Sequence, residues 1–190
     1  DSNNDGSGDF SNSAGTFTTG GNTLSITAND FSLSGAINTG SGTAKIFVSD
    51  AGTIGLGSTS ANMTISGAEL GNITADTLTI GGSTAGDMTV NGINSSDSTN
   101  ISTVDLNSAS IAFSTGGSTF KALTLTANTG SITGAVALTV TSGISNFTTS
   151  GANQSITLSD TSNDFKGAVS LNTNGSSADA TLATNSSIIL

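Results

Sequence analysis

The sequence contains no cysteine, histidine, arginine, proline, tryptophan or tyrosine. Without cysteine there is no disulfide, and no thiolate that could act as a metal ligand or nucleophile. Without histidine, cysteine and arginine, the chain lacks the side chains of the usual catalytic triads and anion clamps. The missing residue types therefore predict a protein that is not an enzyme.

Positive charge is also scarce. Three lysines stand against 13 acidic residues, which gives a formal net charge of −10. Binding to nucleic acid or to an anionic lipid surface requires basic patches, so we expect neither partner. The sequence has no apolar run of about 18 residues, the length that a transmembrane helix needs. Membrane insertion is therefore not expected.

The composition nevertheless favours a folded chain. Hydrophobic residues make up 34% and charged residues only 8%, whereas disordered chains combine low hydrophobicity with high charge or many prolines. Short runs alternate between aliphatic and hydroxyl side chains, as in Leu24–Thr27, Met63–Ser66, Leu123–Thr126 and Ile156–Ser159. This period of two indicates strands with one buried and one exposed face. Gly, Asn, Ser and Asp separate the runs and predict turns.

Many short strands fit a sandwich, a barrel or a solenoid. The strands are only three or four residues long, aromatic residues make up 4%, and the chain repeats itself. The sequence FTTGGNTLSITANDF (Phe17–Phe31) returns as FTTSGANQSITLSDTSNDF (Phe147–Phe165). We interpret this repeat as a duplicated block of stacked coils. It predicts that Phe17 and Phe147, and likewise Phe31 and Phe165, occupy equivalent core positions.

These features together predict an all-β fold, a right-handed parallel β-helix (β-solenoid). Repeat units of this kind have about 20 to 25 residues, so residues 17–190 should form about eight coils. Residues 1–16 are expected to be an acidic N-terminal segment, either a tail or a calcium loop.

Two stretches carry a family resemblance: LGNITADTLTIGGSTAGDMTVNGI (Leu70–Ile93) and NDFKGAVSLNT (Asn163–Thr173). They are similar to the β-strand repeats of filamentous-haemagglutinin-like and autotransporter adhesins of bacteria. The resemblance extends over about residues 17–190 and lies in the sequence pattern of the repeats rather than in a catalytic motif. It implies a parallel β-helix at the bacterial cell surface.

A calcium loop is the strongest metal motif. Asp1, Asn3, Asp5 and Asp9 alternate as oxygen ligands would, and a glycine follows Asp5 at the position of the sharp turn. Position 12 is Asn12, where a bidentate glutamate is expected. The alternative is a solvated acidic tail. No cofactor other than this possible calcium ion is expected.

The remaining acids are scattered singly beside Asn, Ser or Gly, where aspartate supports turns by bonding its own backbone. Parallel β-helices do include polysaccharide hydrolases and lyases, which use paired carboxylates. The turn role is the better interpretation of these acids.

Threonines at alternate positions suggest another surface. Thr77/Thr79, Thr124/Thr126 and Thr139/Thr141 have the T-x-T spacing that orders water in ice-binding solenoids. Threonine is also simply a favourable outward residue on a β-surface.

The segment Ser187-Ile188-Ile189-Leu190 is expected to form an uncapped, largely apolar strand. Unpaired strand edges recruit further strands, so we expect this edge to pair with another copy of the chain or with continuing repeats of a longer one. The sequence thus predicts a secreted, self-assembling subunit of a bacterial surface fibre, stalk or matrix. The alternatives are an adhesin segment that binds a glycan or host surface, for instance through the loop Asn94–Asn100, and an ice-binding solenoid.

Overall fold

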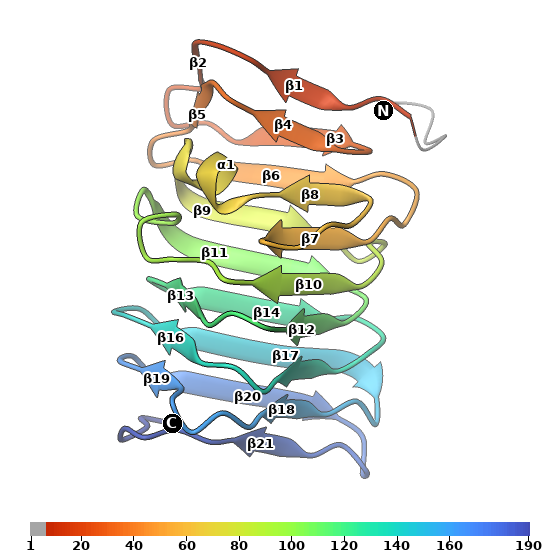
Figure 1. Cartoon of the computed structure of the whole chain (residues 1–190). Helices are drawn as coiled ribbons and strands as arrows, with labels where there is room; N and C mark the ends of the chain where they lie inside the picture. The colour runs from red at the N-terminus through yellow and green to blue at the C-terminus, as the bar shows by residue number, and fades with distance from the viewer. Residues whose placement is uncertain (1–6) are drawn as a thin grey trace.

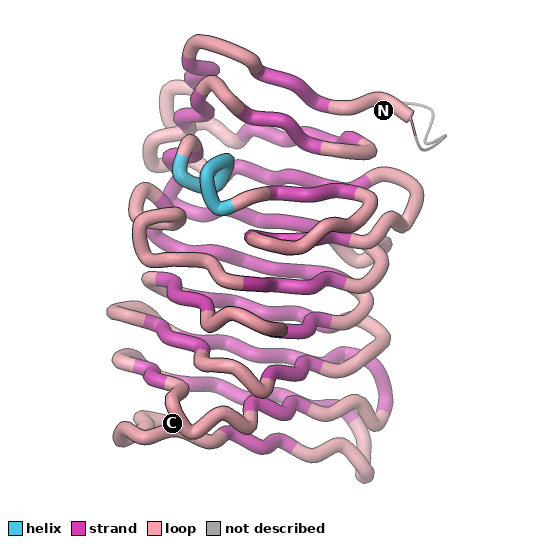
Figure 2. The backbone as a smooth tube through the Cα atoms, in the orientation of Figure 1, coloured by secondary structure: helices cyan, strands magenta, loops and turns pink. Residues whose placement is uncertain are grey.

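The computed structural model describes residues 7–190, which consist of short β-strands and one short helix, α1 (Gly67–Gly71) (Figure 2). Every strand pair in this part of the chain is parallel. The chain runs left to right behind the molecule and right to left in front while it descends from the N-terminus to the C-terminus (Figure 1). This path is a right-handed coil of about eight turns, which confirms the predicted parallel β-helix.

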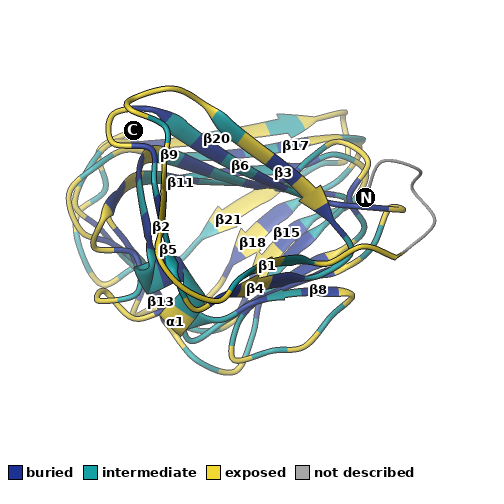
Figure 3. Ribbon diagram, turned by 90° about the horizontal axis from the view of Figure 1, so that it is seen from above, coloured by how far each residue is buried: buried dark blue, intermediate teal, exposed yellow. Residues whose placement is uncertain are grey.

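Three faces form the wall of the solenoid (Figure 3). The first face stacks the longest strands, in this order: β3 (Leu24–Ala28), β6 (Thr43–Val48), β9 (Ile73–Gly81), β11 (Ile101–Ser108), β14 (Leu123–Ala127), β17 (Ser145–Ala152) and β20 (Val169–Asn174). β9 is long enough to belong to two faces, because its start pairs with β5 and its end with β6.

The second face contains shorter strands. Two of them form a separate pair at the N-terminal end, β1 (Phe10–Asn12) and β4 (Phe31–Leu33). The others stack in the order β8 (Met63–Ile65), β7 (Ile54–Gly57), β10 (Met88–Asn91), β12 (Ile111–Phe113), β15 (Ile132–Gly134), β18 (Ile156–Leu158) and β21 (Ala180–Leu182).

The third face closes the coil. At the N-terminal end it consists of β2 (Thr16–Thr18) and β5 (Ala36–Asn38), which lead onto the start of β9. Nearer the C-terminal end it consists of β13 (Ser118–Phe120), β16 (Leu138–Val140) and β19 (Asp164–Phe165).

The core is a set of stacked columns. Because side chains alternate along a strand and the strands pair in register, each inward residue lies directly above its counterpart in the next coil. One buried column on the first face runs through Ile26, Ile46, Ile80, Leu106, Leu125 and Phe147. The period-two runs of the sequence therefore supply the core, as expected.

The coils differ in length. In-register partners on the first face stand at positions 24, 44, 78, 104, 123, 145 and 169, so successive steps are 20, 34, 26, 19, 22 and 24 residues. The step of 34 contains an extra strand, since β7 is followed by β8 and α1 within one turn. The loop that joins β7 to β8 crosses the outside of β7, where a Cβ on Gly55 would lie 2.5 Å from the Thr59 carbonyl oxygen.

Two carboxylates join β4 to the segment formed by β8 and α1, although β4 and β8 share no backbone ladder. Asp30 Oδ1 accepts hydrogen bonds from the backbone N–H groups of Phe31 and Thr64, both at 2.8 Å. Glu69 of α1 accepts from Leu33 N–H at 3.0 Å with one oxygen, and from the N–H and hydroxyl of Ser66 with the other, both at 2.8 Å. The Glu69–Ser66 contacts form the capping box of α1.

The expected equivalence of the repeated phenylalanines is wrong. Phe17 lies on the third face in β2 and is 51% exposed, whereas Phe147 is fully buried on the first face in β17. Phe31 and Phe165 are both buried, but they lie on the second and third faces. The reason is the unequal coil length: the offset between the two copies of the repeat does not correspond to a whole number of turns.

The boundary expected between an N-terminal segment and the solenoid also shifts. β1 begins at Phe10 and pairs with β4, so residues 10–12 of the expected tail belong to the wall. Asp1, Asn3 and Asp5 of the expected calcium loop lie outside the described residues. Asp9 is exposed and receives a long 3.5 Å hydrogen bond from the Asn29 amide.

Candidate functional site

The N-terminal end of the solenoid presents open strand edges. Within residues 7–190, β1, β2 and β3 each pair with only one other strand. Phe17 pairs in register with buried Ile37, yet itself remains half exposed. The half-buried ring of Phe10 stacks on Phe31 with ring centres 5.2 Å apart. A depression of about 370 Å³ lies between the two outermost phenylalanines, Phe10 and Phe17.

The C-terminal end is open in the same way. β20 and β21 are the last strands of their sheets, and the half-buried Leu171, Leu182 and Ile188 pack against the core from this end. Of the predicted assembly edge Ser187–Leu190, Ile189 forms a single parallel bridge with Ala168, and its carbonyl accepts from Val169 N–H at 2.7 Å. Ile189 and Leu190 are 62% and 90% exposed. The strands β20 and β21 therefore form most of the edge at this end.

The side of the first face is polar and built of in-register columns. One outward column reads Ser25, Lys45, Thr79, Asp105, Thr124, Asn146 and Ser170. A second contains Thr27 and Phe47 in the upper coils and Asn107, Thr126, Thr148 and Asn172 in the lower ones. Hydroxyl and amide side chains thus cover most of this wall, with Lys45, Asp105 and Phe47 as the exceptions.

The T-x-T pairs do not form one surface. Thr77/Thr79 and Thr124/Thr126 lie on the first face, where Asp105 separates Thr79 from Thr124. Thr139 instead lies on the third face between Thr119 and Asp164. Two uninterrupted columns hold three threonines each: Thr43, Thr77 and Thr103 on the first face, and Thr133, Thr157 and Thr181 on the second.

Four of the described carboxylates, those of Asp30, Glu69, Asp97 and Asp160, accept hydrogen bonds from backbone N–H groups. Asp97 accepts from Asn94 N–H at 2.8 Å and Asp160 from Ser162 N–H at 2.7 Å. The Asp97 contact also closes the loop Asn94–Asn100 that was considered as a glycan contact. Among residues 7–190 no cluster of three acids could hold a metal ion. The contacts of Asp97 and Asp160 agree with the turn role that the sequence indicated for its acids.

The described lysines occupy three different settings. Lys166 forms an ion pair with Asp164 at 2.8 Å, and Lys121 donates to the Thr99 carbonyl. The ion pair and the Ser186 hydroxyl hold the pKa of Asp164 below its ordinary value of 3.8. Lys45 lies two coils from Asp105 in the same outward column.

Asp105 is the acid whose environment disfavours its charge. Burial raises the pKa of its carboxyl above 3.8, although Thr79 donates a 3.3 Å hydrogen bond to it and Lys45 attracts it. A raised pKa in the folded state means that folding favours the protonated carboxyl. The stability that this group contributes is complete below about pH 3.8 and is lost as the pH rises through the folded-state pKa.

Asp105→Asn is therefore expected to raise the melting temperature at pH 7, since the amide has the same shape without the buried charge. The advantage should shrink as the pH falls through the raised folded-state pKa and should be absent below about 3.8, where the aspartate and the asparagine are both neutral. Thermal unfolding of both proteins at pH 7 and pH 3 measures this. An asparagine variant that melts no higher than the parent at pH 7 would contradict the expectation.

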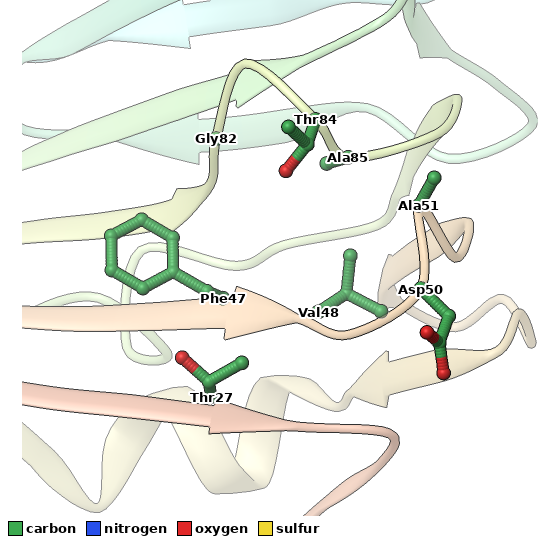
Figure 4. Close-up of a pocket in the computed structure, with 8 residues that line it drawn as sticks. All are labelled: Thr27, Phe47, Val48, Asp50, Ala51, Gly82, Thr84 and Ala85. Carbon is green, nitrogen blue, oxygen red and sulfur yellow. The ribbon is translucent and has the colours of Figure 1, made fainter. Parts of the chain in front are cut away.

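An aromatic depression lies at the corner between the first and second faces (Figure 4). It has a volume of about 530 Å³ and is lined mainly by Phe47, Val48, Gly82, Thr84 and Ala85. The ring of Phe47 and the side chain of Thr84 point into the same space, while the carboxylate of Asp50 turns away at the rim. Asp50 and Ala51 have φ angles of 53° and 52°, and Gly52 N–H donates to the Ser49 carbonyl at 3.0 Å. This tight turn sets the edge of the depression.

Sequence reasoning missed both Phe47 and the Asp30–Glu69 joint. Phe47 sits in an alternating run, TAKIFV, where a large apolar residue at an outward position is the only signal. Glu69 is the only glutamate in the chain and stands three residues after Ser66, the spacing of a capping box. Its second role, as an acceptor for β4, depends on a contact between coils and leaves no local pattern.

The comparisons with known proteins identify repeats but no function. Residues 98–172 match the model of a family described as "Repeats of unknown function (DUF5649)". The match covers less than half of the chain and extends from just before β11 into β20, where successive coils are 19, 22 and 24 residues long. No curated protein and no solved structure matches. No helix within residues 7–190 is long and apolar enough to cross a membrane.

Proposed function

We propose that this chain is a length of structural rod: a β-solenoid of an extracellular bacterial fibre, stalk or matrix that continues at its ends by strand pairing. The continuation is a second copy of the chain or further repeats of a longer one. The observation that carries the proposal is the contrast between open apolar ends and a closed polar side wall.

The two ends are different and compatible. All strands are parallel, so the upper end presents the free edges of β1, β2 and β3, and the lower end those of β20 and β21. An interface between unlike ends is heterologous and builds an open filament when its rotation does not close. Parallel pairing would add backbone hydrogen bonds and cover the apolar residues at both ends.

The cell-surface setting comes from the resemblance to filamentous-haemagglutinin-like and autotransporter adhesins. The repeat-family match and the solenoid fold support the repeat character that this resemblance implies. An adhesive role for the rod is the alternative within the same class, and its test is binding to a host surface or glycan.

Sedimentation velocity tests end-to-end pairing. The parent protein is expected to sediment as larger species as its concentration rises, whereas Phe17→Lys should remain at the size of one chain. A charge on the open edge strand would be buried unpaired in the assembly, and strand edges carrying lysine resist pairing.

Ile144→Lys is the matched control. Ile144 is 52% exposed, almost the same as Phe17 at 51%, but it precedes β17 on the side of the rod. The two variants have the same net charge, so they separate an end effect from general repulsion. Concentration-independent sedimentation of the parent, or equal behaviour of both variants, would overturn end-to-end pairing between copies of this chain.

A further inference from the structure

We propose that the depression around Phe47 is a carbohydrate subsite that binds one neutral hexopyranose unit of a glycan, with a face of the sugar ring stacked on the phenyl ring. This inference goes beyond the proposed rod: it assigns a ligand to the side wall and does not depend on how the ends pair.

The first argument is the position of Phe47. Ile46 and Val48, its neighbours in β6, are buried in the core, so Phe47 projects from the outer surface. Its in-register neighbour on β3 is the exposed Thr27, and the outward column continues lower down with Asn107 and Thr126. Phe47 is the one aromatic residue among residues 7–190 that projects outward from the side wall, since Phe10 and Phe17 lie at the end. Core packing therefore does not require an aromatic ring here.

The second argument is the space beside the ring. A Cβ on Gly82 would lie 3.3 Å from the nearest carbon of the Phe47 ring, so glycine keeps this side of the ring uncrowded. The turn at Asp50 and Ala51 carries the chain away through two left-handed residues, a conformation that residues other than glycine seldom adopt. The resulting volume of about 530 Å³ is that of a small-ligand site rather than of a groove for a folded partner.

The third argument is the chemistry of the rim. Thr84 is exposed and points toward the space beside the ring (Figure 4), and Lys45 projects from the same face of β6 because it precedes Phe47 by two residues. An apolar plate bordered by the hydroxyl groups of Thr27 and Thr84 fits a pyranose, which has an apolar C–H face and a rim of hydroxyl groups. Asp50 places a negative charge at the rim, which favours a neutral sugar over an anionic one.

A nucleic acid base also stacks on aromatic rings, but its phosphates would meet a chain with a net charge of −10. A protein partner would need a larger apolar contact than one half-buried ring provides. The observations therefore favour a neutral glycan.

NMR titration of the ¹⁵N-labelled chain tests the assignment. The probes are cellohexaose, laminarihexaose, mannohexaose and chitohexaose, with a galacturonate hexamer as the anionic comparison. We expect at least one neutral probe to shift the amide signals of Phe47 and Thr84 saturably. Phe47→Thr should weaken this binding about tenfold, the loss expected when one aromatic stacking contact is removed.

The variants keep the fold intact. Threonine already occupies the outward column of Phe47 at Thr27, Thr126 and Thr148, so Phe47→Thr introduces a residue that suits the position. Phe47→Tyr should retain binding, and Thr148→Ala in the same column should not alter it. The proposal is overturned if no neutral probe binds, if only the galacturonate hexamer binds, or if Phe47→Thr binds as tightly as the parent.

Discussion

Phe147→Ala is expected to lower the free energy of unfolding by about 3–5 kcal/mol, the usual cost of removing a fully buried phenyl ring. Phe147 is completely buried in β17 between Leu125 of the coil above and Leu171 of the coil below. Its ring also meets Phe165 edge-to-face, with centres 5.9 Å apart. The deletion would leave a cavity that rigid stacked sheets cannot easily close. Urea denaturation followed by circular dichroism gives the value.

Phe17→Ala is the informative comparison, because Phe17 is the residue that the sequence repeat matches to Phe147. Phe17 lies half exposed at the open end, so its removal should cost less than about 1 kcal/mol. Similar losses in the two variants would mean that the two phenylalanines do occupy equivalent positions, and that the coil register described above is wrong.

Glu69→Ala is expected to destabilise the chain by about 2–4 kcal/mol. The carboxylate accepts three hydrogen bonds: from Leu33 N–H and from the N–H and hydroxyl of Ser66. A hydrogen bond to a charged group contributes about 1.5–3 kcal/mol and a helix cap about 1 kcal/mol. Besides the stability loss, the amide hydrogen of Leu33 should exchange faster with solvent, because its acceptor is gone.

Two further variants serve as comparisons for Glu69→Ala. Glu69→Gln keeps an oxygen for Leu33 N–H but places an amide NH₂ where Ser66 needs an acceptor, so an intermediate loss is expected. Asp76→Ala removes the same charge from an exposed position and should change stability by less than about 0.5 kcal/mol. Unchanged exchange of the Leu33 amide in Glu69→Ala would show that this carboxylate does not link α1 to β4.

The sequence predicts the local features of this fold well. The run Leu123–Thr126 shows why: alternation in the sequence becomes alternation of buried and half-buried side chains in β14. The same holds for Met63–Ile65 and Ile156–Leu158, each buried on both sides of an outward threonine. Period-two patterning depends only on neighbouring residues, so it predicts the strands whatever the arrangement of the coils.

The pairing of strands between coils could not be predicted from these local patterns. The repeated segments around Phe17 and Phe147 look alike, but the extra strand β8 and the helix α1 lengthen one coil and move the later copy to another face. Asn29–Asp30 and Asn163–Asp164 illustrate the consequence. Asp30 joins two strands of the second face, whereas Asn163 is fully buried at a corner and donates to the carbonyls of Leu158 and Ala183.

The candidate sites show the same contrast between local features, which the sequence predicts, and contacts between coils, which it does not. The sequence indicated an apolar edge at Ser187–Leu190, and that segment does lie at an open end, but most of the edge there belongs to β20 and β21. No sequence motif marks Phe47, because the space beside its ring is formed by Gly82 in the next coil and by the turn at Asp50. Contacts between coils, rather than residue types, define both surfaces.

Electron microscopy of the purified parent chain tests the central claim most directly. About eight turns, rising about 4.8 Å each, make one chain a rod of about 40 Å. End-to-end pairing predicts unbranched rods of uniform width whose lengths are multiples of this value and increase with protein concentration. Single particles of about 40 Å at every concentration, or clusters joined along their sides, would contradict it.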